Sequence, residues 1–255
     1  MAYPSFRVDG QVTLVTGAAR GLGRAIALAL ADAGADVALG LRDAASADDL
    51  VGEIEALGRR ALPLQMDVTH LDEVRAAVAR ARDELGRIDI LVNNAGGGRM
   101  GAAKDVSEAD FDHIVDANLK GLFFTSQAAA EVMRANGGGR IVNIGSQAGF
   151  VALPDESVYC MAKAGVSHLT KCLAVEWGPD GILVNAVAPT FIATPGTEPA
   201  LSDPEFRARV VENIAALHRI GDPMDVAGAV VYLASPASSL VTGTTLVVDG
   251  GWTAR

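Results

Sequence analysis

Apolar and polar positions along this chain predict strands and helices in regular alternation. Short runs rich in apolar residues are separated by longer, alanine-rich stretches with helical spacing. Most of the short runs are almost continuously apolar, which is typical of strands buried on both faces of a sheet. The expected strands are residues 11–16, 36–41, 61–66, 88–92, 140–144, 182–187 and 244–248.

This alternation predicts the α/β fold class. We expect a doubly wound, Rossmann-like parallel sheet of about seven strands, with helices on both faces. No internal repeat or linker divides the sequence, so a single domain over residues 1–255 is expected. Ser/Thr-x-x-acid signals at Ser46, Thr69 and Ser107 predict helix starts. Ligands of such sheets bind beyond the carboxyl ends of the strands, where we expect the functional residues.

The segment from about 190 to 220 interrupts the alternation. Pro195, Pro199 and Pro204 predict an irregular loop, and a short helix is expected near residues 205–216. Long insertions in compact domains are usually lids or binding loops, so we expect this one to enclose a substrate. A solvated surface loop is the alternative.

Composition narrows the classes of partner. There are 31 acidic and 21 basic residues, a net charge of −10, which disfavours nucleic acid and anionic membranes. Cys160 and Cys172 do not form a disulfide framework, and no apolar run approaches the length of a membrane span. No His/Cys cluster has metal-ligand spacing, so no metal site is expected. We expect a cytoplasmic protein that binds a small molecule.

A glycine-rich turn follows the first predicted strand. Gly17, Gly21 and Gly23 precede a helix expected over residues 24–33. Glycines allow a tight turn and close approach of the backbone to a pyrophosphate, and the helix N-terminus favours that anion. Between a strand and a helix, this spacing predicts a dinucleotide site.

The end of the second strand bears on the choice of dinucleotide. Leu41 stands where an NAD enzyme usually has an acidic residue, and Arg42 follows. The guanidinium groups of Arg42 and Arg20 can pair with the 2′-phosphate of NADP. Asp43 leaves an alternative open, because its carboxylate can neutralise Arg42 or bind a ribose hydroxyl. NADP(H) is favoured over NAD(H).

A second group of residues has the chemistry of an acid/base site. Tyr159 and Lys163 lie four residues apart in a helical stretch and therefore share one face. A nearby ammonium group lowers a tyrosine pKa, so that the phenol can exchange a proton with an alcohol or ketone. Ser146 follows the fifth strand, where its hydroxyl can hydrogen-bond a substrate oxygen.

These motifs together resemble the short-chain dehydrogenase/reductase family. The resemblance rests on residues 16–23 and 93–96, on Asn118, Ser146, Tyr159 and Lys163, and on residues 248–251. It implies that Tyr159 is the general acid/base, that Ser146 positions the carbonyl, and that Lys163 binds the nicotinamide ribose. It also implies that Asn118 holds a water of a proton relay, and that the protein is a homotetramer. The cofactor residues expected from the motifs and from this resemblance are Gly17, Arg20, Gly21, Leu22, Gly23, Arg42, Asp67, Val68, Asn94, Ala95, Gly96, Tyr159, Lys163, Pro189, Thr190, Ile192 and Thr194.

One departure from the family pattern concerns the substrate. The family commonly has Pro-Gly after the sixth strand, whereas this chain has Pro189-Thr190. This pair is similar to members that reduce ketoses or oxidise sugar alcohols, so we expect an oxidoreductase acting on a polyol or ketose. A 3-oxoacyl thioester reductase is the alternative. A non-catalytic dinucleotide-sensing protein on the same fold is the alternative from another class.

Overall fold

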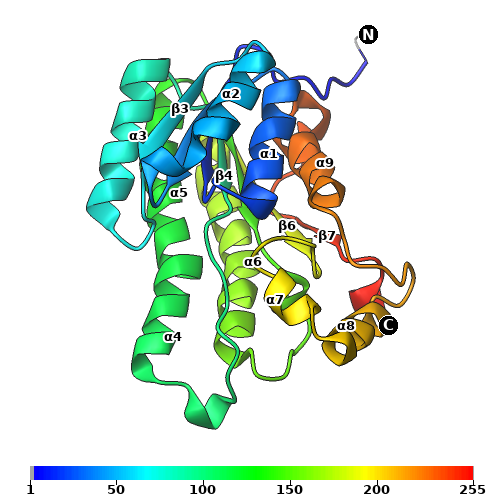
Figure 1. Ribbon diagram of the computed structural model, residues 1–255. Helices are drawn as coiled ribbons and strands as arrows, with labels where there is room; N and C mark the ends of the chain where they lie inside the picture. Colours follow the sequence, from blue (N-terminus) through cyan, green and yellow to red (C-terminus); the bar gives the residue numbers. More distant parts are fainter. Residues whose placement is uncertain (1–2, 255) are drawn as a thin grey trace.

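The computed structural model describes residues 3–254. Seven parallel strands form one sheet in the order β3-β2-β1-β4-β5-β6-β7 (Figure 1). The strands are β1 (Val12–Thr16), β2 (Asp36–Leu41), β3 (Ala61–Gln65), β4 (Ile90–Asn93), β5 (Gly139–Ile144), β6 (Ile182–Pro189) and β7 (Thr245–Val248). The predicted fold class is confirmed, and each predicted strand is present within two residues of its expected ends.

Helices cover both faces of the sheet, because successive strand residues point to opposite faces. On one face α1 (Gly21–Asp32), α2 (Asp48–Ala56) and α9 (Pro223–Ala234) pack against residues such as Val15. On the other face α3 (Leu71–Leu85), α5 (Gly121–Ala135) and α6 (Ser157–Trp177) pack against residues such as Leu14. The shorter helices are α4 (Glu108–Val115), α7 (Glu198–Leu201) and α8 (Pro204–Asn213).

Two of the three predicted helix caps are wrong. Helix α2 begins at Asp48 without a side-chain cap, because Asp43, not Ser46, caps the preceding turn by accepting from Ala45 N. Helix α3 begins at Leu71, and Thr69 hydrogen-bonds Asp67 instead of capping it.

The third predicted cap is confirmed, since Ser107 Oγ accepts from Asp110 N at 3.1 Å. The predicted start of the helix expected over residues 24–33 is wrong, because α1 begins earlier, at Gly21 inside the glycine-rich turn.

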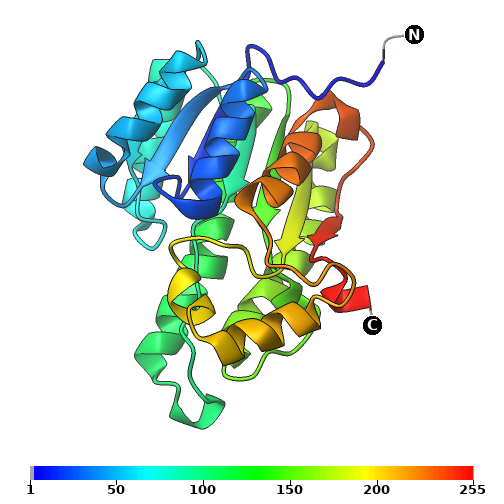
Figure 2. The same cartoon turned by 45° about the vertical axis from the view of Figure 1, so that its right-hand side comes forward.

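The segment expected to form a lid carries α7 and α8 and lies beyond the carboxyl ends of β5 and β6 (Figure 2). Its single predicted helix is shorter than expected, ending at Asn213. The C-terminal turn holds this segment in place. Trp252 stacks on Phe191 with ring centroids 5.7 Å apart, and Gly250 O accepts from Ala216 N and Leu217 N.

Candidate functional site

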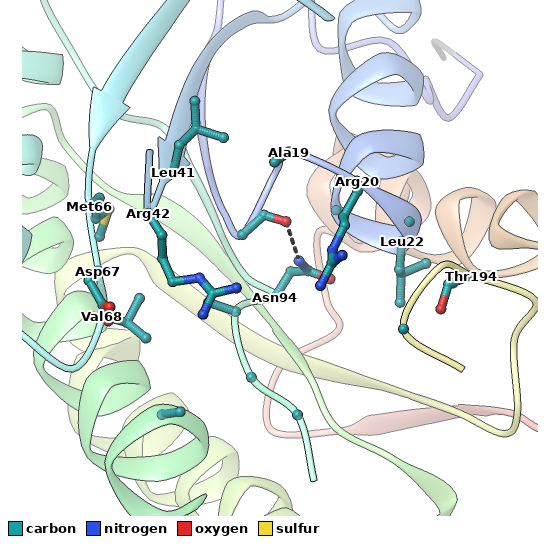
Figure 3. Close-up of a pocket in the computed structure, with 18 of the residues that line it drawn as sticks. Ala19, Arg20, Leu22, Leu41, Arg42, Met66, Asp67, Val68, Asn94 and Thr194 are labelled. Atoms are coloured by element: carbon teal, nitrogen blue, oxygen red, sulfur yellow. Dashed lines mark hydrogen bonds between the residues drawn. The ribbon is translucent and has the colours of Figure 1, made fainter. Parts of the chain in front are cut away.

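A cavity of about 610 Å³ lies at the carboxyl ends of β1, β2 and β4. Here the strand order reverses, and in open α/β sheets this is where ligands bind. The predicted cofactor residues that line the cavity are Gly17, Arg20, Gly21, Leu22, Gly23, Arg42, Asp67, Val68, Asn94, Ala95, Gly96 and Thr194 (Figure 3).

The glycine-rich turn leaves no room for larger side chains. Gly17 and Gly21 have φ of +66° and +56°, which other residues rarely adopt. A Cβ on Gly23 would lie 2.3 Å from Gly17 O and 2.5 Å from Asn94 Nδ2. Helix α1 begins directly at this turn, and its N-cap, Arg20, makes no side-chain capping bond. The first amides of α1 are therefore available to an anion in the cavity.

Hydrogen bonds join the end of β1 to the loop after β4. Thr16 Oγ1 accepts from Asn94 N and Ala95 N, both at 3.0 Å. The Asn94 side-chain amide donates to Thr16 O at 2.9 Å and to Gly17 O at 3.1 Å. This pairing fixes the floor of the cavity and the path of the glycine-rich turn.

A second polar network lies just beneath that loop. Asn93 Nδ2 donates to Ser126 Oγ at 2.8 Å and to Asn143 Oδ1 at 2.9 Å. Asn143 in turn donates to Thr170 Oγ1 of α6 at 3.0 Å. All four side chains are buried, so the network ties β4 and β5 to the helices α5 and α6.

Two arginines point into the opening of the cavity from different elements (Figure 3). Arg20 comes from the glycine-rich turn and Arg42 from the end of β2, and both are exposed. Within residues 3–254, neither guanidinium makes a hydrogen bond or an ion pair. The Asp43 carboxylate is engaged elsewhere, accepting from Ala45 N at 3.0 Å. Both guanidinium groups are therefore free to pair with an anionic ligand.

Asp67 and Val68 form the wall of the cavity beside Arg42 and across from Arg20 (Figure 3). Burial raises the pKa of the Asp67 carboxyl, but this effect is outweighed by hydrogen bonds from Thr69 and by the charges of His70 and Arg42. The net pKa is therefore lower than that of a free aspartate. A charged acceptor thus lies beside an apolar surface, which suits a polar heterocycle.

Ser146, Tyr159 and Lys163 come together beyond the end of β5. Ser146 caps a short turn by accepting from Ala148 N at 3.1 Å, and its hydroxyl donates to Gln147 Oε1 at 2.8 Å. Lys163 is 4% exposed, and its Nζ donates to Ile144 O at 2.9 Å. The same Nζ lies 5.5 Å from the centroid of the Tyr159 ring.

The cluster of Ser146, Tyr159 and Lys163 adjoins the cavity through Gly96 and Gly98. A Cβ on Gly98 would lie 3.4 Å from the Tyr159 ring, and one on Gly96 would lie 3.6 Å from Lys163 Nζ. A Cβ on Gly96 would also lie 2.5 Å from Asn118 Oδ1, and φ of Gly96 is +157°, so both space and backbone geometry exclude a larger residue. The cavity and the Tyr159–Lys163 pair are therefore two parts of one site.

Asn118 lies in a single π-helical turn, Asp116–Lys120, between α4 and α5. Its Nδ2 donates to Gly97 O at 2.8 Å and to Ile114 O at 2.9 Å, and its Oδ1 accepts from Gly97 N at 3.2 Å. The Asn118 side chain thus holds the loop at Gly96 and Gly97, which lies between Asn118 and Lys163. Such π-turns frequently occur at functional sites.

Burial shifts the pKa values of the two ionisable groups of this cluster. It raises the pKa of the Tyr159 phenol to about 12, although the neighbouring Ser146 hydroxyl acts in the opposite direction. It lowers the pKa of the Lys163 ammonium to about 8. Further positive charge near the phenol is needed before Tyr159 can act as a base at neutral pH.

Five of the predicted cofactor residues lie outside the lining of the main cavity. Tyr159 and Lys163 belong to the adjoining cluster, and the other three come from the end of β6 and the segment after it. Pro189 is buried at the end of β6. Thr190 and Ile192 instead line a separate cavity of about 150 Å³ between the lid, β7 and α9.

Several cavity residues were missed by the sequence analysis. No sequence motif indicates that the segments carrying these residues lie next to the cavity. Examples are Ser46, Met66, Thr69, Arg99 and His113. Pro195 lines the cavity beside Thr194. The prolines that predicted a loop after the sixth strand were the only sequence feature that pointed to this position.

Residues 3–254 contain neither a metal-binding cluster nor a membrane-spanning helix. No group of three or more His, Cys, Asp or Glu side chains there is arranged to hold a metal ion. Across the same residues, no helix is long and apolar enough to cross a membrane.

The fold and the site together define a dinucleotide-binding α/β oxidoreductase. A family model described as enoyl-(acyl carrier protein) reductase matches residues 17–253. A crystal structure of a short-chain type dehydrogenase/reductase from Mycobacterium marinum superimposes with a TM-score of 0.93 at 42% identity, covering 98% of both chains. The chain belongs to the short-chain dehydrogenase/reductase family, and it is an oxidoreductase acting on CH–OH groups.

Curated relatives include enzymes with different substrates. The chain is 42% identical to the 2-dehydro-3-deoxy-D-gluconate 5-dehydrogenase of Escherichia coli strain K12, covering 100% of both chains. It is also 42% identical to the 3-oxoacyl-[acyl-carrier-protein] reductase of Synechocystis sp., covering 96% of this chain and 97% of the relative. Family membership therefore does not decide between a sugar-type substrate and a 3-oxoacyl thioester.

The buried Lys163 ammonium generates a pH-dependent prediction. Its pKa is about 8 in the folded protein and 10.5 in the reference state, so between these values the unfolded chain binds more protons. Stability contributed by this group therefore rises as pH increases. From about pH 7 to about pH 10, we expect the unfolding free energy of the wild type to gain about 2 kcal/mol relative to Lys163→Met.

Urea denaturation at a series of pH values measures this difference. Lys171→Met is the matched control, because Lys171 lies on the same helix and is exposed. Its pH profile should run parallel to that of the wild type. Parallel profiles for the wild type and Lys163→Met would contradict the assignment of a destabilised buried ammonium.

Proposed function

We propose that this protein transfers a hydride between NADP(H) and the CH–OH or C=O group of a polyol or ketose. The observation that carries the proposal is the junction of two sites: a cavity with an uncapped helix N-terminus and two free arginines, adjoining Ser146, Tyr159 and Lys163. The nicotinamide supplies or accepts the hydride. The protein supplies binding, orientation and proton transfer.

The residues lining the cavity fit a nicotinamide dinucleotide. The turn at Gly17, Gly21 and Gly23 would hold the diphosphate against the amides of α1, with Thr194 from the lid on its other side. Asp67 and Val68 would flank the adenine, and residues 94–96 would support the adjacent ribose. Lys163 would bind the nicotinamide ribose, and Pro189, Thr190 and Ile192 would support the nicotinamide from behind the cleft.

The preference for NADP(H) rests on Arg20 and Arg42. Both are unpaired at the edge of the cavity where the second strand ends, and Leu41 stands in place of the usual acidic residue. Asp43 is committed to the backbone of the next turn, which reduces its ability to bind a ribose hydroxyl. A gluconate 5-dehydrogenase from Burkholderia cenocepacia J2315, solved in complex with NADP and tartrate, has a TM-score of 0.95 at 35% identity and covers 99% of this chain and 98% of that one.

Tyr159 would exchange the proton of the reacting oxygen. In the oxidation direction its phenolate accepts the proton of the substrate hydroxyl, and in the reduction direction its phenol donates one to the carbonyl oxygen. Ser146 holds that oxygen. Lys163 stabilises the phenolate through its positive charge, and water near Asn118 would link Lys163 to solvent.

The polyol or ketose class is favoured by the sugar-acid dehydrogenases among the relatives. A 3-oxoacyl thioester is the second candidate, favoured by the Synechocystis relative. The presence of the complete Ser146, Tyr159 and Lys163 set argues against a purely dinucleotide-sensing protein.

We further propose a homotetramer located in the cytoplasm. Several large apolar side chains of residues 3–254 are exposed away from the site, among them Val175 at 79% and Leu240 at 96%. Exposed apolar groups of this size are frequent at subunit interfaces.

Replacing Arg42 tests the cofactor proposal. With Arg42→Leu, we expect kcat/KM for NADPH to fall about 10- to 100-fold, because a charge-assisted hydrogen bond is lost, while kcat/KM for NADH stays within about twofold. Initial rates with one fixed substrate measure both values. Arg82→Leu, on the exposed surface of α3, is the control and should change neither. An equal loss with both cofactors would contradict the assignment.

Replacing Tyr159 tests the acid/base assignment. With Tyr159→Phe, we expect turnover of a ketose to fall at least about 100-fold, because the proton donor is lost. NADPH binding, followed by the fluorescence of the bound cofactor, should remain because the cavity is intact. Lys171→Met on the same helix is the control and should turn over normally. Unchanged turnover by Tyr159→Phe would exclude this residue as the proton donor.

A further inference from the structure

Glu156 is a carboxyl group beside the catalytic tyrosine that the chemistry above does not use. It is the N-cap residue of α6 and precedes Tyr159 by three residues, which places the two one helical turn apart. The Glu156 carbonyl begins the helix by accepting from Cys160 N at 2.8 Å. The side chain makes no capping bond.

The Glu156 carboxyl also has no other partner in the described chain. Within residues 3–254 it makes neither a hydrogen bond nor an ion pair, although its residue is only partly exposed. Burial raises the pKa of this carboxyl, and no hydrogen bond or cation offsets that effect. Its negative charge is close enough to Tyr159 to raise the pKa of the phenol. A half-buried carboxylate without a protein partner is open to a ligand hydroxyl, and a hydrogen bond to a charged acceptor is stronger than one between neutral groups.

The surroundings of Glu156 face the substrate side of the site. The loop that ends at Glu156 is joined to the loop after β4 by a hydrogen bond from Gly101 N to Asp155 O at 2.8 Å. That second loop carries Gly98, whose Cβ position is 3.4 Å from the Tyr159 ring. Val151 and Leu153 of the first loop pack against the lid. Glu156 therefore lies between the β4 loop, the lid and the phenol that receives the substrate proton.

We propose that Glu156 determines substrate specificity by accepting a hydrogen bond from a hydroxyl on the carbon next to the reacting carbon. The substrate class is then a vicinal diol, or an α-hydroxyketone in the opposite direction. A 3-oxoacyl thioester has no hydroxyl on either carbon next to its ketone, and it leaves the carboxylate unpaired. This inference rests on the proposed function, because it names the substrate class of that same site.

The test compares substrates with and without the neighbouring hydroxyl. Oxidation of erythritol, D-threitol, L-threitol and 2-butanol with NADP⁺, and reduction of acetoacetyl-CoA with NADPH, are measured for the wild type and for Glu156→Leu and Glu156→Gln. For Glu156→Leu, we expect kcat/KM for the best tetritol to fall about 10- to 100-fold. The values for 2-butanol and acetoacetyl-CoA should stay within about twofold or rise.

Asp155→Asn is the matched control, because it removes one negative charge at the adjacent exposed position. Asparagine tolerates the φ of +61° found there. This variant should retain the tetritol preference. Glu156→Gln keeps the shape of the side chain and one acceptor oxygen, so it should lose less than Glu156→Leu. If Glu156→Leu does not fold, the role of Glu156 is decided by comparing the kcat/KM of Glu156→Gln for the tetritols with its kcat/KM for 2-butanol.

The outcomes separate this inference from the proposed function. Equal losses on the tetritols and on 2-butanol would overturn the role of Glu156 while leaving a polyol dehydrogenase intact. A wild type that reduces acetoacetyl-CoA faster than it oxidises any tetritol would overturn the proposed substrate class and this inference together. Loss confined to the tetritols supports both.

Discussion

The pairing of Thr16 with Asn94 is the interaction on which the rest of the site depends. In a sheet whose strand order reverses between β1 and β4, the connections after these two strands run to opposite faces and leave a gap. The hydrogen bonds from Asn94 and Ala95 to Thr16, and from Asn94 to Gly17, hold the two sides of that gap together. They fix the glycine-rich turn on one side and, through Gly96, the neighbourhood of Lys163 on the other.

The electrostatics of the site follow from burial. The Tyr159 phenol and the Lys163 ammonium are both held in the protein interior, and burial favours the neutral form of each. The free protein therefore holds a tyrosine that is a proton donor. Under the proposed function, a positively charged nicotinamide ring next to Tyr159 would favour the phenolate, so cofactor binding would activate the base. The unpaired Glu156 charge acts in the opposite direction and makes that coupling more important.

Much of this architecture was predictable from the sequence because it rests on local signals. Continuous apolar runs identified every strand, and β2 has the predicted ends. Glycine spacing located the turn before α1. The caps at Ser46 and Thr69 were wrong because both hydroxyls bond to a preceding aspartate: Ser46 Oγ donates to Asp43 O, and Thr69 Oγ1 donates to Asp67 Oδ1.

Other features depend on contacts between distant segments, which a single sequence does not reveal. The π-turn around Asn118 is closed by the backbone of Gly97, 21 residues away. The lid is held by Trp252 and Gly250 from the end of the chain, and the separate cavity beside Thr190 results from that closure. The missing partner of Glu156 likewise becomes visible only when all of its neighbours are placed.

Direct hydride transfer between substrate and nicotinamide is the central claim, and isotope transfer tests it most directly. The wild-type enzyme would be incubated with NADP⁺ and a tetritol deuterated at its carbinol carbons, and the NADPH formed would be analysed by mass spectrometry and NMR. The account predicts one deuterium per NADPH, located at C4 of the nicotinamide. NADPH without deuterium, or oxidation of the tetritol without reduction of the dinucleotide, would contradict it.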